Sequence, residues 1–329
     1  MSDALLVRPA LVGRAGEKRR MRDRLIPSLL RAGAVASQSI SSGKGVGLGC
    51  TVAASLIGIN GRILFRLAGG GSFSVRTDDR YWLYYLLLTQ SYETDLDHFL
   101  GRALTSRDSF LDCGANLGLW SIAAARVIGD KTRVVAVEAG LRTFAQLEQN
   151  WTDNGQSFTI LHRAVGMVSG EQVSFFASVG DHASATLIEG LSPDNAQVEV
   201  VTTVSLLDLI DEQLSRQGAS DALIFVKLDI EGMERQVLST IRPNDDGRLV
   251  ILYEDHGNEI NHVTAFVLEQ GFRAAFLADD GTLELIRKET LFRLDELKTD
   301  AARGYNLLAF APTGPAASRL TALFDLDID

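Results

Sequence analysis

The sequence has few cysteines, no long apolar run and no excess of positive charge. Only two of its 329 residues are cysteine, Cys50 and Cys113, so we expect no framework of structural disulfides and a reducing, cytoplasmic location. No Cys-x-x-Cys pair or tight Cys/His group indicates a zinc site. The net charge of −10 argues against a nucleic acid as the main partner.

Signals for a membrane are also lacking. The basic cluster between Arg14 and Arg24 could open a signal peptide, but no compact apolar segment and cleavage site follow it. Residues 45–61 carry no charge, yet five of these seventeen residues are glycine, which makes the segment too short and too poor in helix formers to span a bilayer. We therefore expect no integral membrane span and interpret residues 1–60 as a partly flexible arm with a helix near Lys18–Ala32.

What the sequence does contain is a strand, a glycine turn, a helix and a second strand in succession. Ser109–Cys113 is a short apolar run typical of a buried parallel strand, and Leu117–Ile128 has the composition of a helix. Gly114 and Gly118 bracket the turn between them, where a bulky side chain would block close backbone approach. The second strand ends on Glu138, twenty positions beyond Gly118, which is about the spacing used to hold a ribose diol.

Two classes of nucleotide cofactor fit such a unit. A dinucleotide site needs Gly-x-Gly-x-x-Gly so that a pyrophosphate can lie against the helix N-terminus, but here the middle position is Asn116 and Asp112 precedes the turn. A carboxylate at Asp112 would repel a pyrophosphate, whereas it could hold the ammonium of an amino-acid group, directly or through water. S-adenosylmethionine (SAM) combines an amino acid, a ribose and an adenine. The turn alone also fits a plain strand-to-helix connection.

Expected strands alternate with expected helices up to about residue 310. The hydrophobic content of 46% is high enough for a sizeable core. The pattern predicts an α/β, Rossmann-like fold with a mostly parallel seven-stranded sheet and helices on both faces. The expected core strands are Ser109–Cys113, Arg133–Val137, Phe158–Arg163, Ala222–Asp229, Leu249–Glu254, Phe272–Leu277 and Tyr305–Phe310. The expected helices are Tyr81–Thr89, Asp95–Leu104, Leu117–Ile128, Leu141–Asn150, Val204–Leu214, Gly232–Ile241 and His262–Gln270.

These elements suggest three parts after the arm, the second of which contains an insertion. Residues 61–107 would form a β-hairpin and a helical lead-in that can fold over a ligand, and residues 108–315 the cofactor-binding domain. Residues 170–203 read as a β insertion in that domain, and residues 316–329 as a C-terminal tail.

Acidic residues stand at four expected strand ends: Asp112, Glu138, Asp229 with Glu231, and Glu254 with Asp255. A single carboxylate at such a position often only caps the next helix. In an open α/β sheet, however, ligands bind outside the carboxyl ends of the strands, so four acidic ends at one edge favour a binding site.

With these motifs the chain resembles the FkbM family of SAM-dependent methyltransferases, which have the class I methyltransferase fold. The resemblance covers roughly residues 80–311, and its most specific part is the run from Lys227 to Glu234. The family usually has Glu-Pro after the second strand, where this chain has Glu138-Ala139. The other residues that carry the resemblance are Tyr92-Glu93, Phe110–Gly118, Val135–Glu138, Ala164–Gly166 and Asn306–Phe310.

The resemblance implies in-line methyl transfer from SAM, which leaves S-adenosyl-L-homocysteine (SAH). The acceptor would be a hydroxyl of a small molecule or glycan, such as a sugar, polysaccharide precursor or secondary metabolite. The residues implied around SAM are Glu93, Asp112, Gly114, Ala115, Asn116, Gly118, Glu138, Ala139, Arg163, Ala164 and Asp229.

A base that accepts the hydroxyl proton is expected at the end of the fourth strand, at Asp229 or Glu231, with His182 and His256 as alternatives. Lys227 shares a strand face with Asp229 and can pair with it and keep it ionised. The two carboxylates could also ligate Mg²⁺, although nothing in the sequence requires a metal. An NAD-type oxidoreductase and a non-catalytic SAM-binding module remain as alternatives.

Overall fold

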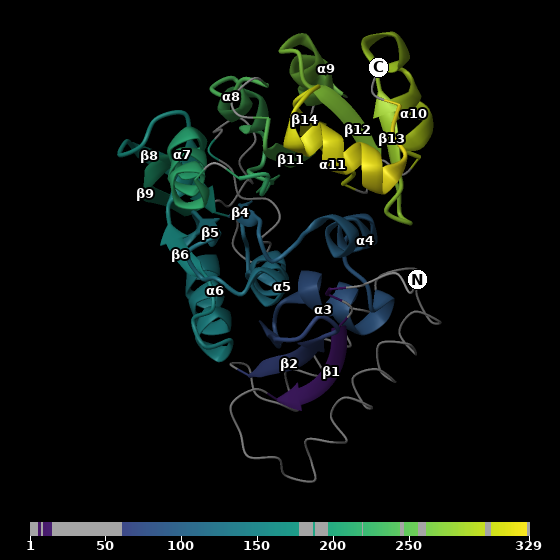
Figure 1. The fold of residues 1–329 in the computed structure, drawn as a ribbon. Coiled ribbons are helices and arrows are strands. Elements are labelled where there is room, and N and C mark those ends of the chain that lie inside the picture. The colour runs from purple at the N-terminus through teal and green to yellow at the C-terminus, as the bar shows by residue number, and fades with distance from the viewer. Residues whose placement is uncertain are drawn as a thin grey trace.

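The structure is a computed structural model, and an eight-stranded sheet forms its centre (Figure 1). The structure describes residues 6–7, 9–14, 61–177, 187, 197–218, 220–243, 247–255, 261–299 and 304–327. The strand order is β13-β12-β14-β11-β10-β4-β5-β6. The bounds are β4 Ser109–Cys113, β5 Val134–Glu138, β6 Thr159–His162, β10 Ile224–Leu228, β11 Leu249–Glu254, β12 Arg273–Leu277, β13 Leu283–Ile286 and β14 Asn306–Phe310.

Five neighbouring strands are parallel to one another: β11, β10, β4, β5 and β6. β14 lies between β11 and β12 and is antiparallel to both. This arrangement confirms the predicted Rossmann-like class I methyltransferase fold, and all seven expected core strands are present. The eighth strand, β13, pairs antiparallel with β12 at the edge of the sheet. Its short run Leu-Glu-Leu-Ile follows the turn at Gly281 and extends the sheet by a hairpin.

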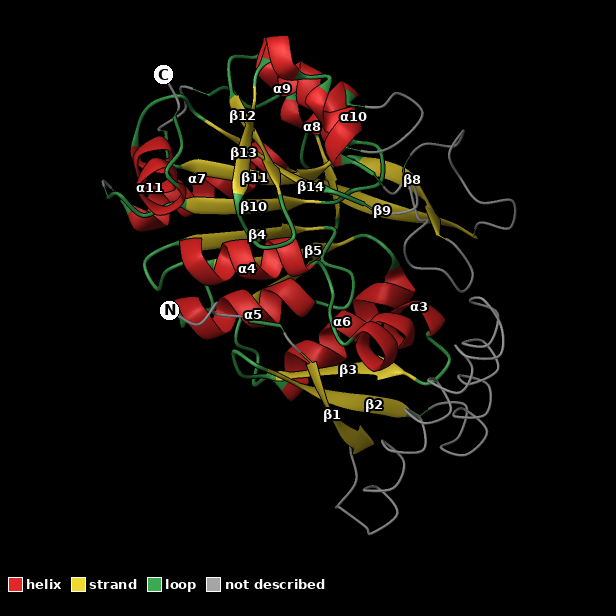
Figure 2. Cartoon of the chain, turned by 90° about the vertical axis from the view of Figure 1, so that its right-hand side faces the viewer, coloured by secondary structure: helices red, strands yellow, loops and turns green. Residues whose placement is uncertain are grey.

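Helices cover both faces of the sheet (Figure 2). Successive residues of a strand point to opposite faces, so Phe110 of β4 packs in one core and Leu111 in the other. The first core includes residues of α4 (Thr94–Ala103), α5 (Leu119–Ile128), α6 (Leu141–Asp153) and α11 (Pro315–Phe324). The second includes residues of α7 (Leu206–Gln217), α8 (Glu234–Leu238), α9 (His262–Glu269) and α10 (Arg293–Leu297). A short 3-10 helix, η4, spans Lys288–Thr290.

The C-terminal segment that the sequence suggested as a tail is mostly helical. α11 begins at Pro315 and buries Ala316, Ala317 and Leu320 against the first core. The two small residues and the leucine lie on one side of the helix because helix neighbours are three and four residues apart.

A second sheet precedes the first, with the order β1-β2-β3. The predicted hairpin is present as β2 (Arg62–Leu67) and β3 (Ser72–Arg76). β1 (Pro9–Arg14), from the segment interpreted as an arm, pairs antiparallel with β2. The expected helix near Lys18–Ala32 lies outside the described residues.

The lead-in after β3 is helical, as expected, but changes type along its length. α3 (Arg80–Leu83) continues directly into a π-helix, η1 (Tyr84–Thr89), which ends at Gln90 in a left-handed conformation. π-Helical turns are rare and are frequently found at functional sites. The segment leads into Glu93 and α4.

The predicted β insertion forms a small third sheet, in the order β7-β9-β8. Its strands are β7 (Ala164–Gly166), β8 (Gln172–Ala177) and β9 (Gln197–Ser205). Most of the segment between β8 and β9, including His182, lies outside the described residues. Among the described residues, no helix has both the length and the hydropathy required to cross a bilayer.

Candidate active site

The glycine loop, residues 114–118, connects β4 to α5 at the carboxyl edge of the large sheet. Gly114 has φ +83° and Asn116 φ +49°, both in the left-handed region. A Cβ on Gly114 would lie 1.8 Å from the main-chain oxygen of Asp229, so glycine is the only residue that this contact allows. The N–H of Asp229 in turn donates to the Cys113 carbonyl at 3.0 Å. The loop and the end of β10 are therefore in direct backbone contact.

Glu138, at the end of β5, is held by two backbone groups on either side of it. Its Oε2 accepts a hydrogen bond from the Asn116 N–H and its Oε1 accepts one from the Gly140 N–H, both at 2.9 Å. These two bonds fix the carboxylate beside the loop. An ionised carboxylate has two acceptor positions on each oxygen, so this type of group can accept hydrogen bonds from ligand hydroxyls as well as from backbone N–H groups.

Three further residues expected near SAM lie beside Glu138. The N–H of Arg163 donates to the Glu138 carbonyl at 3.1 Å, and the Ala139 carbonyl is 3.0 Å from Nε2 of His162. Ala164, the first residue of β7, is buried. The structure therefore brings Ala139, Arg163 and Ala164 to the ends of β5 and β6, next to the loop.

A cluster of charged side chains lies at the ends of the neighbouring strands. Carboxylate oxygens of Glu93, Asp229 and Glu254 all lie within 4.8 Å of one another. Nζ of Lys227 donates to Asp229 Oδ2 at 2.7 Å, which is the pair that the spacing of two predicted. Lys227 also stands opposite Asp112 in the register of β10 and β4. We call Glu93, Lys227, Asp229 and Glu254 the charge cluster.

Burial and mutual repulsion shift the proton equilibria of this cluster. Burial raises the pKa of Glu93 to about 8; Lys227 opposes the shift, while Glu254 and Asp229 add to it. Burial alone would lower the pKa of Lys227, but the surrounding carboxylates, Asp229 first, outweigh it and the pKa is raised. Lys227 is therefore a fixed positive charge beside three carboxyl groups, and once Glu93 ionises the net charge of the cluster favours a further cation.

Asp112 lies beneath this cluster, on the side of α5. Its side chain is 1% exposed, and its Oδ2 accepts a hydrogen bond from Ser121 Oγ at 2.5 Å. Burial raises the pKa of Asp112, and the charge of Lys227 opposes this rise. Because Glu93 and Asp229 are less buried than Asp112, a ligand ammonium at the loop surface meets these two carboxylates first.

The turn after β10 contains Glu231, the second residue expected to act as a base. Glu231 has φ +52° and is partly exposed, but it is not a member of the carboxylate group around Asp229. Glu234, from the same motif, is buried and accepts the N–H groups of Ile230 and Gly232, both at 2.9 Å. Glu234 thus holds the turn that carries Asp229. The other suggested base, His256, lies outside the described residues, as His182 does.

A group of aromatic residues, whose place in the site the sequence did not indicate, lies beside the charge cluster. The rings of Trp82 and Tyr92 lie 4.5 Å apart, and the hydroxyls of Tyr81 and Tyr92 are 3.3 Å apart. Burial raises the pKa of both tyrosines, and the charge of Glu93 adds to the rise, so both remain neutral phenols. The density of aromatic residues between positions 81 and 92 is the signal that could have identified them.

Two tryptophans connect these parts of the site. Trp82 Nε1 donates to Asn116 Oδ1 at 3.2 Å, and Trp120 Nε1 donates to Glu93 Oε2 at 2.5 Å. Asp255, by contrast, is structural: its carboxylate accepts the N–H groups of Val263 and Thr264 at the start of α9. This is the capping role that a strand-end carboxylate often has.

Comparison with known proteins gives one family and several solved structures. Residues 112–274 match the model of the methyltransferase FkbM domain. No curated protein matches the chain. An FkbM methyltransferase structure from Methylobacillus flagellatus is 12% identical with a TM-score of 0.36, and the match covers 71% of this chain and 55% of that one. This chain therefore spans about half the length of that relative.

Two further solved structures are of other methyltransferases. Fibrillarin from Aeropyrum pernix, bound to SAM, is 10% identical with a TM-score of 0.35, and the match covers 76% of this chain and 93% of that one. An O-methyltransferase from Bacillus cereus, in complex with SAH, is 12% identical with a TM-score of 0.29, covering 87% and 99%. Similarity at this level carries no argument about function, so the assignment depends on the domain match. That match includes the glycine loop, Glu138 and Asp229, and through it the chain belongs to the FkbM methyltransferase family.

Proposed function

We propose that this protein transfers the methyl group of SAM to a hydroxyl oxygen. The observation that carries the proposal is the contact between Gly114 and the Asp229 backbone, beside a Glu138 carboxylate held by the loop. This contact brings the carboxylate that we assign to the ribose and a group of acidic side chains to the same edge of the sheet, the edge at which open α/β sheets bind their ligands. In this arrangement Glu138 accepts hydrogen bonds from the ribose hydroxyls, and Arg163 and Ala164 lie on the adenine side.

The charge cluster suits the cationic half of SAM. Glu93, Asp229 and Glu254 supply three carboxyl groups beside the single ammonium of Lys227, and a cation bound beside Glu93 favours its ionised form. SAM carries an ammonium and a sulfonium, and NAD carries a pyrophosphate that such a cluster would repel. In our proposal the SAM ammonium lies against Glu93 and Asp229, and Asp112 supports them from below through Lys227.

The reaction that follows is an in-line displacement. The acceptor oxygen forms a bond to the methyl carbon, the carbon–sulfur bond breaks with its electron pair moving to sulfur, and SAH leaves as a neutral thioether. Alignment of the two partners can lower the barrier by roughly 7–11 kcal/mol. Asp229 accepts the hydroxyl proton, because Lys227 occupies only its Oδ2 and leaves Oδ1 for the acceptor. Glu231, on the following turn, is the second candidate for this base.

The aromatic residues beside the cluster favour a ring-shaped acceptor. Tyr81 and Tyr92 present neutral phenols close to Glu93, and Trp82 adds a third ring. Such faces pack against the C–H faces of sugars and related polyols, and the phenol hydroxyls can hydrogen-bond the acceptor. We therefore propose a sugar, polysaccharide precursor or secondary metabolite as the acceptor, and a soluble small molecule or glycan as the partner.

A divalent cation is the alternative occupant of the charge cluster. Carboxylate oxygens are ligands that Mg²⁺ accepts, and Glu93, Asp229 and Glu254 are close enough to share one ion. Lys227 already places a positive charge on Asp229, which opposes a second cation there. The proposed mechanism uses no metal, and activity lost on chelation and restored by Mg²⁺ would require one to be added.

Titration calorimetry with SAH and with NADH is the first test. Micromolar binding of SAH without binding of NADH is expected, and the opposite result would support an NAD-type oxidoreductase. The second test is a panel of hydroxylated sugars and polyketide-like alcohols with methyl-labelled SAM. Label in an ether product is expected, whereas SAH binding without transfer to any acceptor would support a non-catalytic binding module.

A further inference from the structure

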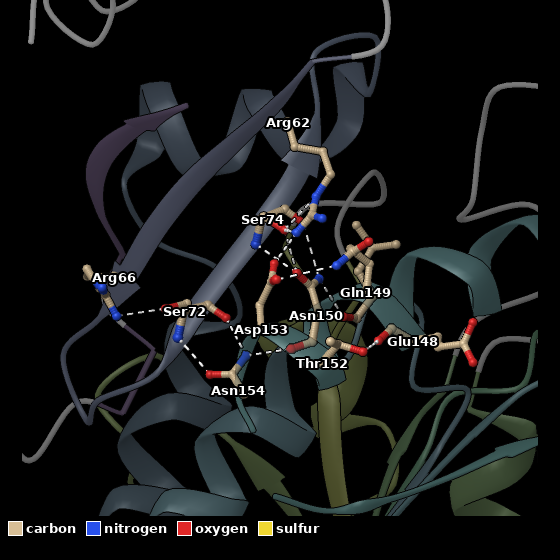
Figure 3. A network of polar contacts seen from close by, with 11 residues as sticks. Arg62, Arg66, Ser72, Ser74, Glu148, Gln149, Asn150, Thr152, Asp153 and Asn154 are labelled. Atoms are coloured by element: carbon tan, nitrogen blue, oxygen red, sulfur yellow. Dashed lines mark hydrogen bonds and ion pairs between the residues drawn. The ribbon is translucent and has the colours of Figure 1, made fainter. Parts of the chain in front are cut away.

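The C-terminal end of α6 covers the β3 edge of the β1-β2-β3 sheet, which we call the N-terminal sheet, with two asparagine side chains: Asn150 of the helix and its C-cap residue Asn154 (Figure 3). Asn154 Oδ1 accepts the Ser72 N–H at 2.9 Å, and its Nδ2 donates to the Ser72 carbonyl at 2.7 Å. Asn150 does the same two residues along β3, accepting from the Ser74 N–H at 3.0 Å and donating to the Ser74 carbonyl at 3.1 Å. Each amide therefore takes the place of a neighbouring strand along this edge.

The spacing of the two elements makes this pairing possible. Asn150 and Asn154 are four residues apart on a helix, a rise of about 6 Å. Ser72 and Ser74 are two residues apart on a strand, a rise of about 6.6 Å. The two amides thus match two of the backbone positions of β3 that point away from β2, and they bind the N-terminal sheet to the end of α6.

Only one of the two asparagines also reaches the glycine loop. Asn150 is fully buried, and its Nδ2 donates a second hydrogen bond to the Leu117 carbonyl at 3.0 Å. Its Oδ1 also accepts from Ser74 Oγ at 2.6 Å, so both donors and both acceptor positions of the amide are used. The corresponding second bond of Asn154 goes to the Asn150 carbonyl, within α6 itself.

The loop is held on this side by two further contacts. Leu147, one turn before Asn150, fills the space beside Gly118, where a Cβ would lie 2.5 Å from its Cδ1. Trp82, which follows β3 in the chain, donates to the Asn116 side chain. α6 and the lead-in thus contact the loop at the consecutive positions Asn116, Leu117 and Gly118, and Asn150 connects these contacts to β3, while Glu138 holds the loop from the opposite strand.

We propose that Asn150 is a positioning residue, which fixes the Leu117 carbonyl and so makes the N-terminal sheet part of the cofactor site. The inference deepens the proposed function, because it assumes that the glycine loop binds SAM. A loop released from Asn150 keeps its sequence but loses its fixed shape, and ordering it again on binding reduces affinity. The chemistry at the methyl group is untouched, so turnover at saturating SAM is unaffected.

The experiment compares Asn150→Ala with Asn154→Ala. Both variants remove one amide that pairs with β3, but only Asn150→Ala frees the Leu117 carbonyl. We expect SAH affinity to fall roughly fivefold to tenfold in Asn150→Ala and by less than twofold in Asn154→Ala. The KM for SAM should rise by a similar factor while kcat stays within about twofold. Asn150→Asp, which keeps an oxygen to accept from the Ser74 N–H and hydroxyl but cannot donate to the Leu117 carbonyl, serves as a second variant if Asn150→Ala folds poorly, and we expect the same direction of change.

Hydrogen exchange of the backbone amides at 114–122 in the unliganded protein provides a readout that needs no ligand. Faster exchange in Asn150→Ala than in Asn154→Ala supports the inference even if SAH does not bind, a result that would count against the proposed function alone. Equal exchange in both variants, or equal SAH affinity in both, overturns the role of Asn150.

Discussion

The main-chain oxygen of Asp229 occupies the space that a side chain on Gly114 would need, 1.8 Å from the position of its Cβ. This contact sets the separation between the ends of β4 and β10. It also places the residue that we propose as the base at a fixed distance from the loop that we propose for SAM. The geometry of the reaction thus depends on a position that carries no side chain.

Gly114→Ala should therefore lower the free energy of unfolding by more than the strain of a positive φ alone would, because the new Cβ collides with the Asp229 oxygen. The suitable control is Gly129→Ala, since Gly129 also has positive φ, +72°, but no atom lies within 4 Å of its Cβ. The control should lose about 1–2 kcal/mol of unfolding free energy from strain alone. Gly114→Ala should lose several kcal/mol and SAH binding with it, as measured by chemical denaturation and calorimetry. Similar losses in the two variants would show that the Asp229 contact yields easily.

Glu138→Gln should weaken SAH binding by about tenfold to hundredfold, because hydrogen bonds from ribose hydroxyls to a charged carboxylate are the stronger kind. An SAH analogue without the 2′-hydroxyl separates this effect from damage to the loop. The wild type should bind the analogue much more weakly than SAH, and the variant should discriminate little between the two. If the variant still discriminates as the wild type does, Glu138 does not hold the ribose.

Asp229→Asn should reduce turnover by about 10²–10⁴-fold while SAH affinity changes less. The amide keeps the shape of the side chain but cannot accept the hydroxyl proton. The paired variant Glu231→Gln tests the second candidate on the same turn. With an acceptor found by the labelled-SAM screen, kcat of both variants can be measured at saturating SAM. Near wild-type kcat in Asp229→Asn and a large loss in Glu231→Gln would move the base to Glu231.

Glu93 should make stability fall as pH rises. Its pKa is about 8 in the folded protein and about 4.3 in an unfolded chain, so between these values the folded state keeps a proton that the unfolded state has released. The unfolding free energy contributed by this group is therefore highest below about pH 4 and decreases until the folded carboxyl ionises near pH 8. Denaturation of the wild type and Glu93→Gln between about pH 5 and 9 should show a steeper fall in the wild type; parallel curves would contradict the shift.

Binding of SAM should release a proton near neutral pH. A cation placed beside Glu93 favours its charged form and lowers its pKa, so part of the Glu93 population ionises on binding. Calorimetry in buffers of different ionisation enthalpy measures this release, and Glu93→Gln should abolish it. Proton release that persists in the variant would assign the titrating group to another residue.

The fold could be predicted well because it depends on local patterns. The buried strands Ser109–Cys113 and Leu249–Glu254 are apolar runs bounded by turns, and their alternation with helices determines a parallel sheet. β1 and β13 were missed since each is a short strand whose pairing partner, not its own composition, defines it. Part of the site was also visible in the sequence, because Lys227 and Asp229 are two residues apart on one strand.

The remainder of the site depends on contacts between distant segments. Glu93 reaches the ends of β10 and β11 only because α4 packs on the sheet, and no local pattern near Glu93 indicates that. Asn150 has the composition of an ordinary helix residue, and its partners are 76 and 33 positions away. The burial of Asp112 likewise follows from how α5 covers β4, through Ser121.

The placement of β14 has a consequence for synthesis. β14 is the last of the strands that the structure describes, yet it lies between β11 and β12, which are made before it. A nascent chain that has not reached Phe310 therefore keeps two facing strand edges open, each able to capture a foreign strand. The large sheet of this protein can close only after β14 has been synthesised, and truncation before Asn306 should yield aggregates rather than a smaller folded domain.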